Sequence, residues 1–190
     1  MNTSGSTTRR RLLMALPLAG AGAVGVAFWK MLSGMQHGSF NPHDINAPVL
    51  DRPVPDFNLP GLAPAQGFGT QDLKTLQAPV LVNFFASWCI PCVAEMPTLM
   101  AFKDQLPIWG VAYKDKPENA AAFLRHSGNP FARLGNDPEG RAGMDWGLSG
   151  VPETFLIGPG GVIRWHTAAP LTEDIIRGTI LPLAARLKTP

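Results

Sequence analysis

Hydrophobic positions in this chain form short continuous runs that alternate with stretches of helical spacing. Continuous apolar runs predict strands that are covered on both faces, and they occupy residues 80–85, 108–113, 131–134, 153–157 and 162–166. The glycine-rich turn at 158–161 joins the last two runs as an antiparallel hairpin. Because alternating strands and helices are typical of a sheet with parallel strands, the pattern predicts an α/β fold.

Helical spacing is clearest after Pro91, which suits the first turn of a helix because its missing N–H costs nothing there. Val93, Met96 and Leu99 recur on one face and are expected to pack on the core. Pro97 interrupts this helix and is expected to kink it.

Three further helices complete the pattern. Asp115 with Glu118 is expected to cap a helix that runs through residues 120–125. A small helix is predicted at 141–146. Thr172 is expected to cap a last amphipathic helix with its apolar residues on one face.

The region before residue 80 carries weaker signals. Residues 53–59 alternate as a strand does, but their prolines place that strand at a sheet edge. Residues 61–69 are expected to form a loop. Residues 33–52 are polar and rich in Gly, Asn and Pro, which predicts a tether between an N-terminal segment, residues 1–32, and one domain at 53–190.

The N-terminal segment has the pattern of a membrane anchor. Three arginines at 9–11 precede residues 12–29, which carry no charge. A helix of that length spans about 27 Å, close to the thickness of the bilayer's hydrocarbon core. The arginines are expected to stay in the cytoplasm, which puts the rest of the chain on the far side of the inner membrane. The small residues at 19–21 leave a cleavable signal peptide open, and the arginines vaguely resemble a twin-arginine export signal.

Charge is distributed unevenly along the chain. The formal net charge is +2, but the first 30 residues contain four basic side chains and no acid, so the remainder has a charge of −2. A nucleic-acid partner is therefore not expected, because the domain has no excess of basic side chains. Hydrophobic residues make up 45% of the sequence, which is enough for an ordinary core.

Both cysteines lie in the segment Trp88-Cys89-Ile90-Pro91-Cys92, between a predicted strand and a predicted helix. At a helix start, unpaired backbone N–H groups and the helix dipole favour the thiolate. A thiolate attacks a disulfide, and a second thiol within reach expels the resulting mixed disulfide. As a structural staple, so short a loop would contribute only about 2 kcal/mol. The spacing therefore predicts a redox-active pair.

Two polar residues near this pair have alternative interpretations. Glu95 lies one helical turn beyond Cys92 and is either a solvated carboxylate or a proton acceptor and electrostatic brake for the thiols. Asn83 interrupts an apolar strand, so its amide must find a hydrogen-bond partner or stay near the surface.

These motifs resemble a known fold and, more narrowly, a known family. The cysteine segment after a buried strand, Pro97 beyond it, and Val151-Pro152 before a hairpin resemble thioredoxin. The narrower likeness is to the CcmG/DsbE family, the membrane-anchored periplasmic thiol:disulfide interchange proteins of cytochrome c biogenesis. It covers about residues 53–187 and is carried by residues 113–116, 128–131 and 147–157. It implies a thioredoxin-like fold: a central mixed sheet flanked by helices, with an N-terminal extension strand, after a transmembrane helix.

The resemblance also implies roles for the cysteines and for the loop that faces them. Cys89 would be the attacking thiol and Cys92 the resolving thiol of a redox-active disulfide. Pro152 would follow a cis peptide bond and pack against that disulfide. The backbone beside it, at Val151, would bind the extended chain of a substrate.

Three more residues match positions that this family uses around its active site. Trp88 matches the tryptophan before the first cysteine, and Glu95 and Glu153 match acidic residues near the site. Trp88 and Glu153 are expected to take part in binding the substrate. Thioredoxin's buried aspartate is replaced here by Asn83, and an amide cannot accept a proton. We therefore expect Glu95 to act as the base for Cys92.

The implied activity is that of a periplasmic protein-disulfide reductase. Its substrate would be apocytochrome c, or the maturation partners of apocytochrome c, before haem attachment. Because the periplasm is kept oxidising, a membrane electron donor of the DsbD or CcdA type would restore the dithiol. No cofactor and no metal are expected.

Other activities fit the motifs less well. A general oxidoreductase of other specificity stays open, but a DsbA-like oxidase would typically carry a histidine where Ile90 and Pro91 stand. Metal carriers of this fold typically space their cysteines by three residues and add a histidine, whereas His126 and His166 are isolated here. The threonine-containing cysteine motif of the peroxidases is absent.

Overall fold

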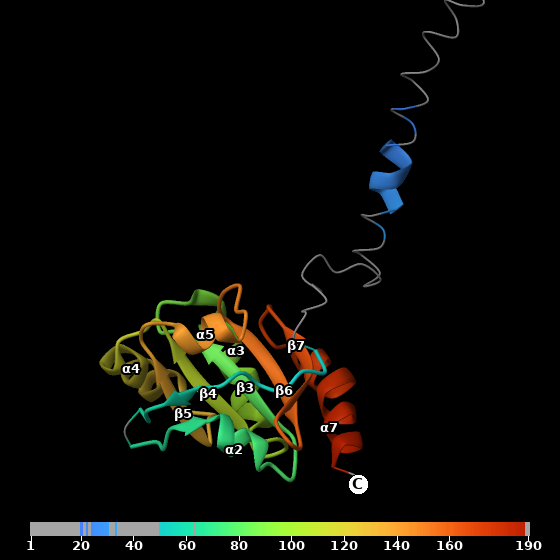
Figure 1. Ribbon diagram of the computed structural model, residues 1–190. Coiled ribbons are helices and arrows are strands. Elements are labelled where there is room, and N and C mark those ends of the chain that lie inside the picture. Colours follow the sequence, from blue (N-terminus) through green and yellow to red (C-terminus); the bar gives the residue numbers. More distant parts are fainter. Residues whose placement is uncertain are drawn as a thin grey trace, which may run out of the picture. The chain divides into compact units, whose positions relative to one another are not determined.

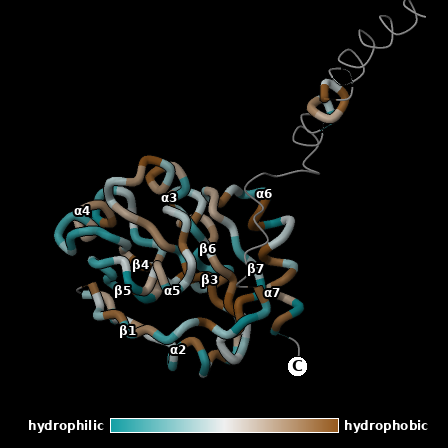
Figure 2. Tube along the Cα trace, turned by 45° about the horizontal axis from the view of Figure 1, so that its top comes forward, coloured by the Kyte–Doolittle hydropathy of each residue, from teal (hydrophilic) through white to brown (hydrophobic). Residues whose placement is uncertain are grey.

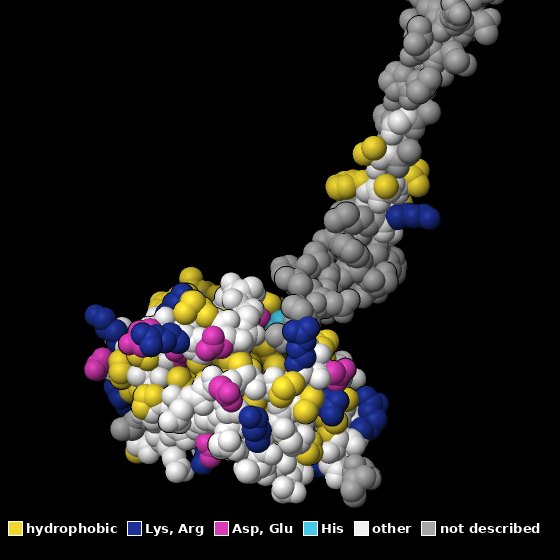
Figure 3. Space-filling model, in the orientation of Figure 1, with side chains coloured by type: hydrophobic (Ala, Val, Ile, Leu, Met, Phe, Trp, Pro, Cys, Tyr) yellow, Lys and Arg dark blue, Asp and Glu magenta, His cyan; other side chains and the backbone are white. Residues whose placement is uncertain are grey.

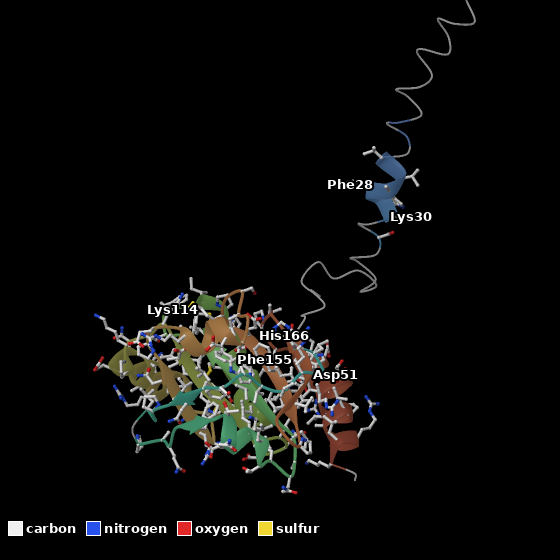
Figure 4. All side chains as sticks on the ribbon, in the orientation of Figure 1. Phe28, Lys30, Asp51, Lys114, Phe155 and His166 are labelled. Carbon is white, nitrogen blue, oxygen red and sulfur yellow. A yellow bond between two sulfur atoms is a disulfide. The ribbon has the colours of Figure 1, made fainter. Side chains whose placement is uncertain are left out.

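The structure is a computed structural model, and it describes residues 20, 22, 24–30, 33, 50–62 and 64–188. Contacts divide the chain into two compact units, residues 1–45 and 46–190. In the first unit the described residues are helical, with exposed apolar side chains such as Phe28 beside Lys30 (Figure 4). No helix formed by the described residues is long and apolar enough to cross a bilayer. The predicted anchor, residues 12–29, and tether, residues 33–52, lie largely outside the described residues.

The second unit is built on a mixed sheet with the strand order β5-β4-β3-β6-β7 (Figure 1). Its strands are β3 (Val80–Phe85), β4 (Ile108–Tyr113), β5 (Arg133–Asp137), β6 (Glu153–Gly158) and β7 (Val162–Thr167). The first three are parallel, and β6 and β7 form an antiparallel hairpin that pairs antiparallel with β3. The predicted central mixed sheet flanked by helices is confirmed.

Each face of the sheet is covered by its own layer, because the side chains of a strand alternate between the faces. In β3, Leu81 and Phe85 join the hydrophobic cluster that contains α3 and the C-terminal helices, whereas Val80, Val82 and Phe84 join the cluster on the other face. The first layer consists of α3 (Ile90–Phe102), α4 (Pro117–Ser127), α6 (Glu173–Ile175), η1 (Ile176–Ile180) and α7 (Leu181–Leu187). The last three alternate between hydrophobic and hydrophilic positions (Figure 2).

An N-terminal arm covers the other face and reaches both edges of the sheet. Asp51 and Arg52 pair with β7, and residues 60–66 pair with β5. Between and beyond these contacts the arm forms β1 (Asn58–Leu59), β2 (Phe68–Gly69) and α2 (Thr70–Lys74). Because both edge strands are partly paired by this arm, fewer backbone N–H and C=O groups of the sheet stay open. The same layer contains α5 (Arg141–Asp145).

Several local predictions differ from the structure. The predicted strand 53–59 is reduced to one bridge at Pro53 and the two-residue β1, and β2 forms inside the predicted loop 61–69. The strand predicted at 131–134 is displaced to 133–137. α4 begins at Pro117 without a side-chain cap, because Asp115 instead binds the loop before the cysteines.

α3 contains Pro97 and runs to Phe102. This helix differs from its prediction in one respect. Val93, which its helical spacing placed on the core face, is 47% exposed.

Candidate active site

The two cysteines form a disulfide at the N-terminus of α3, with 5.3 Å between their Cα atoms. Cys89 is the N-cap residue, and its sulfur accepts a hydrogen bond from the Cys92 backbone N–H at 3.1 Å. Pro91 in the first turn removes a donor that would have no helical partner. Cys89 is 4% exposed and Cys92 is fully buried, so the sulfur of Cys89 is the more accessible one.

The segment before the disulfide is held by the loop after β4. Both carboxylate oxygens of Asp115 accept hydrogen bonds from Ser87: Oδ2 from the backbone N–H at 2.6 Å and Oδ1 from the hydroxyl at 3.0 Å. The Trp88 indole N–H donates to the Lys114 carbonyl at 3.1 Å. The carboxyl ends of β3 and β4 therefore meet at the disulfide, and Asp115 joins them.

A second loop, residues 149–152, faces the disulfide from the sheet. The Val151–Pro152 peptide bond is cis, as the resemblance implied. The Val151 carbonyl oxygen lies 3.4 Å from the Cys89 sulfur. A disulfide sulfur carries no proton, so this contact becomes a hydrogen bond only when Cys89 is a thiol.

Glu153 holds this loop from the start of β6. Its Oε2 accepts hydrogen bonds from the Ser149 backbone N–H at 3.0 Å, the Ser149 hydroxyl at 3.3 Å and the Gly150 N–H at 3.3 Å. Its Oε1 lies 2.5 Å from Nε2 of His166 in β7. Glu153 is 1% exposed. Its carboxylate therefore contacts the backbone of the loop and not the solvent.

Glu95 is the buried carboxyl group on the helix that carries the cysteines. It is 2% exposed, one turn beyond Cys92. Its oxygens accept hydrogen bonds from the Asn83 side chain and from the Leu171 backbone N–H, both at 2.9 Å. Burial raises the pKa of Glu95 from 4.5 to about 7. The two hydrogen bonds lower the pKa, and the bond from Leu171 lowers it more than the bond from Asn83, but burial has the larger effect. Asn83 is the hydrogen-bonded strand residue that we expected, and it also donates to the Thr154 hydroxyl at 2.9 Å.

Two large apolar side chains are exposed next to the cysteines. Trp88 is 59% exposed and Ile90, between the cysteines, is 83% exposed. Elsewhere, basic and acidic side chains are interspersed over the face that Figure 3 shows. Within the described part of the chain, no group of three or more His, Cys, Asp and Glu residues could hold a metal ion.

The structure brings the predicted residues together in two ways. Cys89, Cys92 and the Val151 carbonyl meet at the disulfide. Pro152 follows Val151 through the cis bond, and Trp88 directly precedes Cys89. Glu95 and Glu153 lie behind this surface as buried carboxylates. Sequence reasoning missed three partners of these groups: Asp115, Thr154 and His166.

The sequence contains a signal that could have identified only one of these three partners. That residue is Asp115, which lies two positions after the core strand β4. In an α/β fold, ligand sites gather at the edge formed by the carboxyl ends of the strands. Nothing in the local pattern distinguishes Thr154 or His166 from other strand residues.

Comparison with known proteins agrees with this geometry. The AhpC/TSA family model matches residues 50–166. The thiol:disulfide interchange protein HelX of Rhodobacter capsulatus is 41% identical over 175 residues, which covers 91% of this chain and 96% of HelX. The thiol:disulfide interchange protein DsbE of Xylella fastidiosa is 34% identical over 186 residues, which covers 96% of this chain and 93% of that DsbE.

A solved structure extends the likeness to three dimensions. A thiol:disulfide interchange protein of the thioredoxin family from Chlorobium tepidum is 26% identical, with a TM-score of 0.56 over 70% of this chain and 94% of that one. The fold is therefore thioredoxin-like, and the Cys89–Cys92 disulfide has the position that disulfide exchange requires. The chain belongs to the AhpC/TSA family and, within it, to the CcmG/DsbE family of thiol:disulfide oxidoreductases.

Proposed function

We propose that this protein reduces the disulfide of apocytochrome c, or of the maturation partners of apocytochrome c, before haem attachment. The observation that carries the proposal is the Cys89–Cys92 disulfide at a helix N-terminus, 3.4 Å from the Val151 carbonyl, in a chain of the CcmG/DsbE family. The helix start stabilises the thiolate of Cys89. The neighbouring backbone offers hydrogen bonds to an extended peptide.

The reaction proceeds in two exchanges, starting from the dithiol. The Cys89 thiolate attacks one sulfur of the substrate disulfide, forms a mixed disulfide and releases the other substrate sulfur, which takes up a proton. Cys92 then loses its proton and attacks the Cys89 sulfur. The Cys89–Cys92 disulfide forms, and the second substrate thiol leaves. Two electrons and two protons pass to the substrate.

Glu95 is the proton acceptor for Cys92 in this scheme. A base is most effective when its pKa lies near the working pH, and burial raises the pKa of Glu95 to about 7. Its position one helical turn from Cys92 suits transfer through a bridging water molecule. Titration of Cys92 in a Glu95→Gln variant tests this role, and an unchanged thiol pKa would contradict it.

The substrate lies across the apolar surface at the disulfide. Trp88 contacts it beside Cys89, the Val151 backbone pairs with its extended chain, and Pro152 keeps that backbone against the sulfurs. Glu153 contributes through the loop, since its carboxylate holds the backbone of Ser149 and Gly150.

The protein works on the periplasmic side of the inner membrane. Residues 1–32 hold the cytoplasmic end and the anchor, residues 33–52 form the tether, and residues 53–190 form the periplasmic domain. The exposed apolar side chains of the described helical residues support insertion of this segment: Val24, Val26, Phe28 and Trp29. A membrane electron donor of the DsbD or CcdA type restores the dithiol.

A trapping experiment tests this function. In a Cys92→Ser variant the mixed disulfide at Cys89 cannot be resolved, so the substrate stays attached through a bond that reductant releases. We expect recovery of apocytochrome c or its maturation partners from cells that make c-type cytochromes. A Cys89→Ser variant is the control and should trap nothing through the site. Recovery of a broad set of secreted proteins would instead indicate a general oxidoreductase.

A further inference from the structure

His166 in β7 is a largely buried side chain that the two exchange steps do not use. Its Nε2 lies 2.5 Å from the Glu153 carboxylate, and the two side chains are 9% and 2% exposed. Its ring centroid lies 4.5 Å from that of Phe155, its cross-strand partner in β6. Figure 4 labels both residues in the β6–β7 hairpin. Packing against Phe155 limits the positions that the imidazole can take.

Glu153 connects this histidine to the loop that faces the disulfide. Its Oε1 contacts His166, and its Oε2 accepts the backbone N–H groups of Ser149 and Gly150. These two residues precede Val151, whose carbonyl lies 3.4 Å from the Cys89 sulfur. A continuous chain of contacts therefore runs from β7 to the backbone beside the reactive sulfur.

The carboxylate needs a donor on each oxygen because it is buried. His166 supplies the donor for Oε1, either as the neutral Nε2–H tautomer or as the imidazolium. Without that donor, the carboxylate would turn toward another donor. Such a turn lengthens or breaks its hydrogen bonds to the backbone of Ser149 and Gly150.

We propose that His166 is a positioning residue for disulfide exchange: through Glu153 it fixes the Ser149–Gly150 backbone, and so the Val151 backbone that pairs with a protein substrate. The inference rests on the proposed function in one respect, the use of that backbone by the substrate. Loss of His166 should therefore weaken the binding of peptide and protein disulfides. It should not affect small disulfides, because these reach the Cys89 sulfur without pairing with the loop.

The test compares three variants of the full chain. His166→Leu removes the donor, His166→Gln keeps an N–H donor at similar reach, and His126→Leu is the matched control because His126 is exposed on α4. Each pre-reduced protein is mixed with excess of an oxidised Cys-x-x-Cys peptide, or of the small disulfide 5,5′-dithiobis(2-nitrobenzoate). The maximal rate and the half-saturating peptide concentration are measured in single turnovers.

We expect His166→Leu to raise the half-saturating peptide concentration about tenfold, the effect of losing one charge-assisted contact. Its maximal rate and its rate with the small disulfide should stay within about twofold, and His166→Gln should restore most of the affinity. Equal losses with both substrates, or an unchanged half-saturating concentration, would overturn the proposal. Failure of the unmodified protein to reduce the peptide would count against the proposed function instead.

A second measurement tests the positioning without any substrate. The amide hydrogens of Ser149 and Gly150 should exchange with solvent at least about tenfold faster in His166→Leu than in His126→Leu, since their acceptor is no longer fixed. Unchanged exchange at both amides would refute the role of His166 whatever the kinetic result.

Discussion

Replacing Glu95 by glutamine should remove a pH dependence from the stability of the domain. Glu95 is buried between α3, β3 and the segment before α6, where Asn83 and the Leu171 N–H donate to its oxygens. The substitution keeps the size of the side chain. The introduced carbonyl can accept from Leu171, and its NH₂ then faces Asn83. The Asn83 Oδ1 has no hydrogen-bond partner. If the Asn83 amide group flips, this oxygen can accept a hydrogen bond from the NH₂ of the introduced glutamine.

The magnitude follows from the pKa of the carboxyl group. Burial raises the pKa of Glu95 from 4.5 to about 7, and one pKa unit corresponds to about 1.4 kcal/mol. The protonated form of Glu95 therefore stabilises the folded domain by about 3 kcal/mol relative to the ionised form. Because the side chain is almost fully buried, solvent screening reduces this value little.

The sign follows from proton binding. Between pH 4.5 and 7 the folded protein binds the proton more tightly than the unfolded chain, so stability falls as the pH rises. The contribution is complete below pH 4.5 and is lost as the pH passes about 7. From pH 5 to pH 8 the free energy of unfolding of the Glu95→Gln variant, relative to the unmodified protein, should rise by about 2–3 kcal/mol.

Urea unfolding of the oxidised proteins at several pH values measures this difference. Other titrating groups are common to both proteins and cancel in the comparison. Glu118→Gln serves as the control because Glu118 is exposed in the first turn of α4. If the difference between Glu95→Gln and the unmodified protein stays constant from pH 5 to pH 8, the raised pKa of Glu95 is wrong.

Substitutions at three further residues test packing and hydrogen bonding in the domain, each by urea unfolding. Asp115→Ala removes an acceptor of three hydrogen bonds and should cost about 2–4 kcal/mol, whereas the exposed Asp104→Ala should change little. Trp146→Phe should cost less than about 1.5 kcal/mol, because the buried indole N–H has no partner, and Trp146→Ala about 3–5 kcal/mol. Gly110→Ala would place a Cβ 2.7 Å from an aromatic ring and should destabilise by about 1–3 kcal/mol; Gly178→Ala, with open space around it, should not.

The sheet could be predicted where burial alone determines the structure. β3 and β4 have the predicted bounds because both of their faces are covered, which produces continuous apolar runs. β5 lies two to three residues after its predicted position, because its polar residues Arg133, Asn136 and Asp137 interrupt the apolar run. Its outer side pairs with the arm. β1 and β2 are two residues long, and such strands form through tertiary contacts that leave no periodic signal.

The candidate site also has a part that the sequence predicts and a part that it does not. The cysteine pair and its helix start are encoded within a few residues, so their chemistry could be predicted directly. The contacts that support them join distant parts of the chain: Ser87 and Asp115 are 28 residues apart, and Glu95 and Leu171 are 76 apart. Which polar side chains meet over such separations depends on the completed fold.

The number of hydrogen-bond donors distinguishes the three buried carboxyl groups around the disulfide. Asp115 accepts from three donors and Glu153 from three donors plus His166. Glu95 accepts from only Asn83 and Leu171. Hydrogen bonds to a carboxylate favour its ionised form and burial opposes it. At Glu95 burial outweighs the two hydrogen bonds and raises the pKa.

This difference assigns separate roles to carboxyl groups that look alike in the sequence. Asp115 and Glu153 accept the hydrogen bonds that hold the two loops at the disulfide. Glu95 holds no loop beside the sulfurs and lies on the helix that carries both cysteines. In the proposed mechanism Glu95 gains and loses a proton during disulfide exchange, while the contacts of Asp115 and Glu153 hold the two loops beside the sulfurs.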